Sequence, residues 1–166
     1  MYHFRVLADD DVRSAPLPRS IDRRLALDFL DRLDRAHALL ADAIRIMADQ
    51  TTRPAPDVAG FSTARWRLST ASRQRRKLVA SIVAALRATA DAPTATCLDR
   101  FESEELQSLH QSVTHIHRWT PQSIAADWPG YCQASLGVRR AMRRRLEAEQ
   151  ALFQPILRTL AEPPPA

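Results

Sequence analysis

Glycine and lysine are scarce in this sequence of 166 residues, which contains three glycines and a single lysine, Lys77. So few glycines leave no glycine-rich loop to hold a phosphate group and few sites for the tight turns of a sheet. Alanine, leucine and arginine dominate instead, and these residues favour helices. The composition therefore predicts an all-α protein. The preference for arginine over lysine is typical of a GC-rich bacterial genome, so the number of arginines alone indicates little about function.

Cysteines and long apolar runs are scarce as well. Cys97 and Cys132 are too few for a disulfide framework or a zinc site. No stretch approaches the roughly 18 uninterrupted apolar residues of a membrane-spanning helix. Residues 1–11 lack the basic segment followed by an apolar segment that begins a secretory signal. We therefore expect a soluble cytoplasmic protein without a membrane span.

The net charge of +5 suggests an acidic partner, but the positive charge is unevenly distributed along the chain. Residues 62–90 carry six arginines, Lys77 and no acid, which gives this segment a net charge of +7. The segments 20–50 and 96–119 have net charges of −1 and −2, and 120–162 has +2. If these segments are neighbouring helices, acidic and basic elements alternate. Much of the positive charge can then be neutralised within the fold.

Apolar residues recur at steps of three and four in four segments, which is the pattern of amphipathic helices. We expect helices over residues 20–50, 62–90, 96–119 and 131–160, the first three with the N-caps Ser20, Ser62 and Thr96. The third helix can alternatively restart at Ser103. In the third, the apolar stripe consists of Leu106, Leu109, Val113 and Ile116. Short connections favour neighbours that run in opposite directions. The sequence therefore predicts an antiparallel up-down four-helix bundle.

The expected bundle spans residues 20–162 as one domain. Residues 1–19 combine an acidic run with two prolines and are predicted to form a flexible arm, while 163–166 form a disordered tail. In this topology Cys97 and Cys132 lie at opposite ends of a helix, about 30 Å apart. We therefore expect no disulfide bond between them.

Charged residues interrupt the apolar stripe of the last predicted helix. Where the stripe calls for leucine or valine, the sequence has Arg145 and Glu149. The second helix has a matching gap, because Ala71 is the only apolar residue between Ser69 and Lys77. Buried charges need partners, and guanidinium groups pair well with carboxylates. We predict a buried polar layer of Arg73 or Arg76 with Arg145 and Glu149, which Glu105 or His110 can join; the alternative is that the charges point outward.

The segment from Glu149 to Leu157, EQALFQPIL, resembles the end of a hemerythrin-type (HHE cation-binding) domain. That family carries a histidine in the last helix, a glutamate four residues later and a Leu-Phe-Pro-like stretch, and it has a histidine midway along the first helix, as His37 is here. The resemblance implies a four-helix bundle that binds iron and reversibly binds oxygen. It would draw metal ligands from the set His37, His110, His117 and Glu149.

The chain departs from that family where its ligands are expected. Arg145 stands four residues before Glu149 in place of the histidine, and guanidinium groups do not ligate metals. The second helix offers Ser72 and Arg76 where a His-x-x-x-Glu pair is expected, and Gln154 is inserted before Pro155. We therefore expect a degenerate relative without a cofactor, and iron binding is kept as an alternative hypothesis.

A basic band on the last helix suggests a nucleic-acid or anion surface, formed by Arg139, Arg140, Arg143 and Arg144. The sequence has no helix-turn-helix spacing, no interleaved aromatic residues and no zinc finger, so we expect a solvated face and consider nucleic acid unlikely as a partner. The sequence has no G-x-S-x-G motif, and neither cysteine has a matching histidine and acid. Nothing in the sequence therefore indicates a nucleophilic enzyme. We therefore predict a non-catalytic protein that acts through a protein partner or as a homodimer.

Overall fold

The computed structural model describes residues 21–163, and this part of the chain is all-α and contains no strand. The predicted class is therefore confirmed. Four long helices and one short helix follow one another: α1 (Arg23–Gln50), α2 (Val58–Arg87), α3 (Ala92–Arg118), α4 (Pro121–Ala126) and α5 (Trp128–Ala161). The predicted arm 1–19 lies outside the described residues, as does nearly all of the predicted tail. Helices α2 and α3 begin four residues earlier than the sequence predicted.

Aspartates rather than Ser20, Ser62 and Thr96 begin the first three helices. Asp22 accepts a hydrogen bond from the Leu25 amide at 2.8 Å, and Asp57 and Asp91 cap α2 and α3 in the same way. Pro93 precedes the predicted helix start at Thr96 but lies in the first turn of α3, where proline fits because it needs no amide donor. In α2, Gly60 lets the cap come close, since a Cβ at Gly60 would lie 2.6 Å from Asp57 Oδ2.

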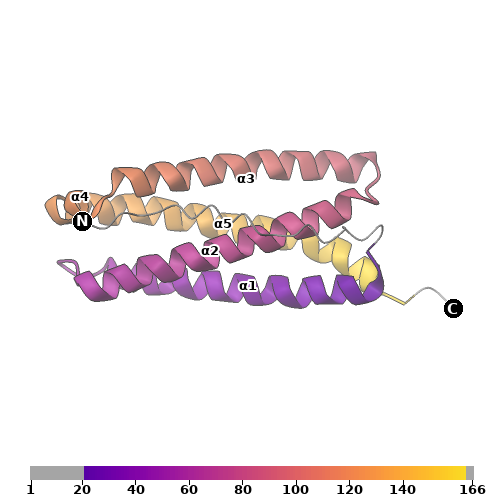
Figure 1. Ribbon diagram of the computed structural model, residues 1–166, viewed down its shortest axis with the longest axis horizontal. Helices are drawn as coiled ribbons and strands as arrows, with labels where there is room; N and C mark the ends of the chain where they lie inside the picture. Colours follow the sequence, from indigo (N-terminus) through magenta and orange to yellow (C-terminus); the bar gives the residue numbers. More distant parts are fainter. Residues whose placement is uncertain (1–20, 164–166) are drawn as a thin grey trace, which may run out of the picture.

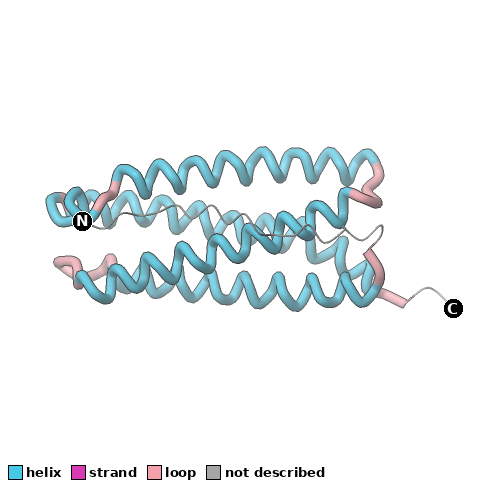
Figure 2. The backbone as a smooth tube through the Cα atoms, viewed as in Figure 1, coloured by secondary structure: helices cyan, strands magenta, loops and turns pink. Residues whose placement is uncertain are grey.

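The four long helices extend along the long axis of the molecule, and α4 lies at one end where α3 connects to α5 (Figures 1 and 2). Helix α1 packs extensively against α2 and α5. Helix α3 makes much less extensive contacts with α5 and α2, and only Leu98 and Phe101 of its residues are buried. None of the helices formed by residues 21–163 is both long and apolar enough to cross a membrane.

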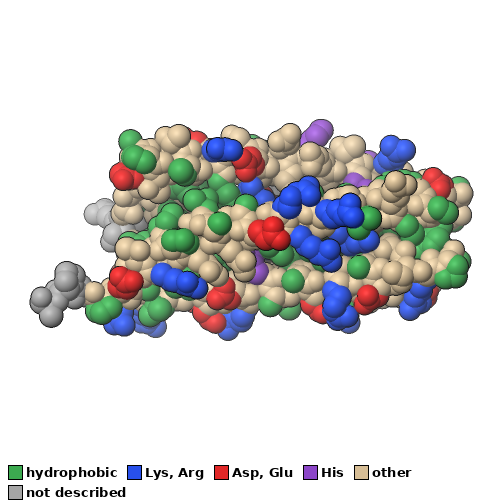
Figure 3. Space-filling view, turned by 180° about the vertical axis from the view of Figure 1, so that it is seen from behind, with side chains coloured by type: hydrophobic (Ala, Val, Ile, Leu, Met, Phe, Trp, Pro, Cys, Tyr) green, Lys and Arg blue, Asp and Glu red, His purple; other side chains and the backbone are tan. Residues whose placement is uncertain are grey.

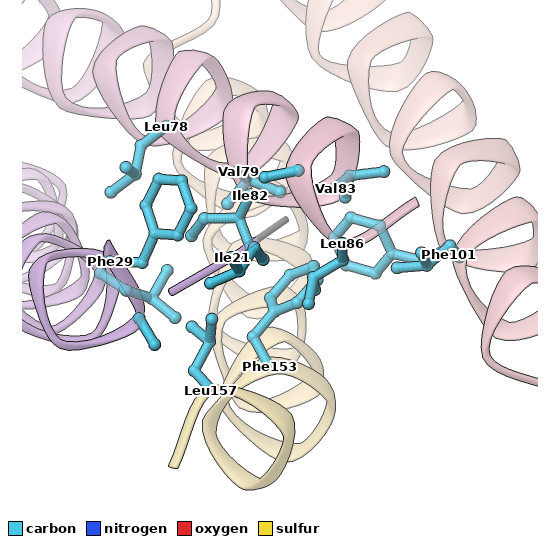
Figure 4. Packing of buried hydrophobic residues seen from close by; sticks show 14 residues of the cluster. Ile21, Phe29, Leu78, Val79, Ile82, Val83, Leu86, Phe101, Phe153 and Leu157 are labelled. Carbon is cyan, nitrogen blue, oxygen red and sulfur yellow. The ribbon is translucent and has the colours of Figure 1, made fainter. Parts of the chain in front are cut away.

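The main apolar core joins α1, α2, the start of α3 and the end of α5 (Figure 4). Phe101 of α3 meets Phe153 of α5 edge to face, with 5.0 Å between the ring centroids. At the end where α4 lies, a second cluster contains Phe61, Trp119, Trp128 and Tyr131. Trp128 is further held by a 2.9 Å hydrogen bond from its Nε1 to the Arg53 carbonyl oxygen. Between the two clusters lies a shorter apolar layer around Leu40, Ile44 and Leu146.

The apolar stripe predicted for α3 does not face the interior. Leu106 is 68% exposed, Val113 41% and Ile116 52%, and Leu109 is half-buried. The expectation that this stripe packs into the core is therefore wrong. Both cysteines are free thiols, Cys97 exposed near the start of α3 and Cys132 half-buried near the start of α5.

Substitution of two leucines of α1 that differ in burial tests how this helix packs against the core. Leu33 is fully buried in the main core, and Leu39 is 60% exposed on the same helix. We expect Leu33→Ala to lower the free energy of unfolding by about 2–5 kcal/mol, since it removes buried methyl groups and leaves a cavity. Leu39→Ala should change it by less than about 0.5 kcal/mol. Urea denaturation followed by circular dichroism measures both, and equal losses would contradict the placement of α1.

Candidate functional site

A layer of five polar side chains crosses the middle of the molecule. It is built from His37 of α1, Arg75 of α2, Glu105 of α3, and Arg145 and Glu149 of α5. Four of the five are buried, and the side chain of Glu105 is 19% exposed. Every long helix therefore contributes at least one charged or titratable group to the interior.

Glu149 is the centre of this layer, and its side chain is inaccessible to solvent. One carboxylate oxygen, Oε1, accepts a hydrogen bond from Arg75 Nη1 and lies 3.5 Å from Arg145 Nε. The other, Oε2, lies 2.9 Å from His37 Nε2, which donates because an ionised carboxylate can only accept. Three groups from three helices thus satisfy one buried carboxylate.

Glu105 completes the layer from α3. Its Oε1 accepts from Arg75 Nη2 at 2.7 Å, and its Oε2 accepts from Arg145 Nε at 2.8 Å. Arg145 also donates to the Phe101 carbonyl oxygen at 3.0 Å, and its guanidinium lies 3.8 Å from the centroid of the Phe101 ring. Such stacking and multiple donation suit arginine and would not suit lysine.

The layer also explains why the α3 stripe faces outward. Two buried guanidinium groups face one buried carboxylate unless α3 supplies a second, and an unpaired buried charge is costly. Turning Glu105 inward brings Ser108 and Ser112 towards the interior beside it, where they line a small pocket. Leu106 then points to solvent because it is adjacent to Glu105 on the helix and lies about 100° around its axis.

The predicted members of the layer divide into two groups. Arg145 and Glu149 lie in it and approach each other, while Arg73 is exposed and Arg76 is half-buried with its Nη1 donating to Ser72 Oγ at 2.9 Å. The arginine of α2 in the layer is Arg75, which the sequence reasoning missed. The available signal was its spacing, since Arg75 precedes the buried Leu78 and Val79 by three and four residues and so shares their face.

The residues named for a metal site do not come together. His37 lies beside Glu149, but His110 and His117 are exposed on α3. Residues 21–163 contain no group of three or more His, Cys, Asp and Glu side chains that could hold a metal ion. Both oxygens of Glu149 are engaged by Arg75 and His37. This donor set, with two guanidinium groups at its centre, does not fit the iron that the hemerythrin resemblance implies.

Three of the four predicted basic-surface residues are exposed. Arg140, Arg143 and Arg144 lie on the solvent side of α5, and Figure 3 shows basic side chains gathered near the middle of one face. The prediction that Arg139 belongs to the basic surface is wrong, because Arg139 is 5% exposed and its Nη1 donates to Ser135 Oγ at 2.7 Å. Tyr131, Ser135 and Arg139 follow at steps of four and share a buried face. Burial lowers the pKa of Arg139 from its ordinary value.

No family model, no curated protein and no solved structure matches this chain.

A double-mutant cycle tests whether Arg75 and Glu149 act as one unit. Arg75→Met leaves a buried carboxylate short of a partner, and Glu149→Met leaves two buried guanidinium groups on Glu105. We expect each single change to lower the free energy of unfolding by about 3–5 kcal/mol. The double variant should lose at least about 1 kcal/mol less than the sum of the two, because the second change removes the charge that the first left unpaired.

Arg73→Met is the matched control, since Arg73 is an exposed arginine of the same helix. Its effect should stay within about 0.5 kcal/mol. Chemical denaturation of the unchanged protein and the four variants gives all of these values. Additive losses from the two single changes would show that Arg75 and Glu149 do not interact.

Proposed function

We propose that this protein is a non-catalytic, antiparallel four-helix bundle of the cytoplasm that acts by self-association through the outer face of α3. The observation that carries this proposal is the exposure of Leu106, Val113 and Ile116 on that helix. A likeness in outline to hemerythrin-type domains, with the metal ligands lost, fits this role. The charged groups of the polar layer pair with one another, which leaves the exposed surface as the part of the molecule available to a protein partner.

The three side chains form one continuous apolar stripe. They are spaced seven and three residues apart, so they lie on one side of the helix over about 15 Å of its length. Scattered exposed leucines are ordinary, but an aligned apolar row on the least packed helix is typical of an interaction surface. Half-buried Leu109 borders the same row.

A second copy of this chain fits the stripe because the charges along α3 are polarised. Asp99 and Glu102 lie in its N-terminal half, and His117 and Arg118 lie at its end. Two antiparallel copies of α3, related by a two-fold axis between positions 109 and 110, place Leu106 opposite Val113 of the second copy. The same axis places Glu102 opposite His117 of the second copy, so both the apolar and the polar contacts repeat symmetrically.

Apolar contact supplies most of the expected affinity. Arg87 of α2 already pairs with Glu102, which leaves less of that charge for a partner. The stripe is also small beside the roughly 800 Å² that each partner buries in a standard interface. We therefore expect a dimer with a dissociation constant on the order of micromolar, that is about −8 kcal/mol.

Anion binding by the exposed face of α5 is a second candidate function, which the cluster of Arg140, Arg143 and Arg144 favours (Figure 3). Neutralisation of phosphates by these arginines would make binding strongly dependent on salt. Because no aromatic side chain is interleaved with the arginines for base stacking, the surface suits a non-specific polyanion better than a particular nucleic-acid sequence.

Sedimentation equilibrium tests self-association. The unchanged protein should show a monomer–dimer equilibrium in the micromolar range. Leu106→Glu combined with Val113→Glu places two carboxylates in each half of the paired stripe, and we expect it to weaken the dimer at least about tenfold. The monomer should keep its helical content and thermal stability, since both side chains are exposed.

Leu39→Glu is the matched control, because Leu39 is 60% exposed on α1 beside exposed Trp66 of α2, away from the stripe. It should leave the dimer intact. A protein that remains monomeric up to millimolar concentration would refute the proposal. A dimer that is broken by Leu39→Glu but not by the α3 variant would refute it as well, and would move the interface to the groove between α1 and α2.

A further inference from the structure

A small polar pocket adjoins the ionic layer between α2 and α3, and α1 and α5 contribute to its walls. Its polar lining consists of Ser72, Arg75, Arg76, Glu105, Ser108 and Ser112. The free space within it is about 20 Å³. A buried water needs roughly 10–15 Å³ measured in this way, so the pocket holds one particle of about that size.

Donors around this pocket are left without acceptors. Arg75 is 5% exposed, yet its Nε has no hydrogen-bond partner among residues 21–163. Arg76 is half-buried, and its one hydrogen bond within the described chain goes to Ser72 Oγ. No carboxylate of residues 21–163 forms an ion pair with it, which sets Arg76 apart from Arg75 and Arg145.

The three arginines at the pocket are not equally paired. Arg75 pairs with Glu105 and Glu149, and Arg145 pairs with Glu104 and Glu105, whereas no carboxylate of residues 21–163 pairs with Arg76. Burial lowers the pKa of the Arg76 guanidinium from its ordinary value, and the charge of Arg75 lowers it further. A half-buried cation beside another cation is destabilised, and a single negative charge nearby would relieve both effects.

We propose that this pocket binds one monatomic anion, chloride, between Arg76, the Nε of Arg75 and the hydroxyl of Ser108. Chloride is close to water in size, so it suits the free space, whereas phosphate or sulfate would require α3 to move away from α2. The anion pairs with Arg76, which has no carboxylate partner among residues 21–163, and gives Arg75 Nε the acceptor that it lacks. Since its ligands come from α2 and α3, it ties the most loosely packed helix to the rest of the protein.

Chloride titration at constant ionic strength tests the proposal, with gluconate as the replacing anion. The line width of the ³⁵Cl nuclear magnetic resonance signal reports binding directly, and the thermal midpoint reports the stabilisation that a ligand of the folded state produces. We expect an excess line width that falls as chloride saturates the site, and a saturable rise in the midpoint. Arg76→Gln should weaken chloride binding at least about tenfold, because it removes the unpaired charge.

Arg73→Gln is the matched control, since it removes an exposed arginine three positions earlier on α2 and should leave chloride binding unchanged. Ser108→Ala is a milder change of the pocket that keeps all the charges, and it should weaken binding while the helical content stays the same. An adventitious surface effect would be equally sensitive to Arg73→Gln and would overturn the proposal. So would an excess line width that stays constant as chloride is added, or competition by sulfate at equal concentration, which would show that the site is not selective for size.

Discussion

The burial of the Glu149 carboxylate is the constraint on which the arrangement of the four long helices depends. A carboxylate that is removed from water must receive hydrogen bonds from nearby donors, and it receives them from Arg75 of α2 and His37 of α1. Arg75 and the adjacent Arg145 then need a second carboxylate, which α3 supplies as Glu105. Each partner fixes the rotation of one helix about its own axis. Apolar contacts alone would leave these rotations less well determined, because leucine and valine pack acceptably in several orientations.

The same constraint accounts for the unusual surface of α3. A helix that must present a glutamate to the interior cannot also present apolar side chains that lie about 80–100° away from it, so Leu106 and Val113 remain in solvent. The ion pairs in the interior therefore determine which apolar residues of α3 are exposed on the surface and can contact a partner. This link joins the buried layer to the proposed self-association, since a change that turned α3 would move its stripe as well.

Sequence reasoning succeeded where a charged residue interrupted a clear apolar stripe. It failed where no apolar residues nearby showed which side of the helix faces the interior. Arg145 and Glu149 stand out because apolar residues precede and follow them on the same stripe. On the N-terminal side of Arg75, no large apolar residue close by shows which face of α2 is buried. Arg73, Arg75 and Arg76 are therefore equally good candidates for the interior until the positions of Leu78 and Val79 are considered. For α3 the periodicity identifies an apolar face correctly, but the partners of that face depend on charges in two other helices. The N-caps of α1, α2 and α3 were missed because serine and threonine were preferred to nearby aspartates, which cap the helices by accepting from the Leu25, Gly60 and Thr94 amides.

The arrangement also shows why an arginine at position 145 changes the chemistry open to such a helical protein. A histidine there would have a ring nitrogen free to ligate a metal with Glu149, whereas a guanidinium offers only donors and keeps its positive charge. The carboxylates then serve to neutralise arginines, and beside the pocket between α2 and α3 this leaves an excess of guanidinium donors. Arg75 Nε and the unpaired Arg76 are what remains of that excess. An interior of this kind is suited to holding an anion, and for the same reason it is unsuited to holding a cation.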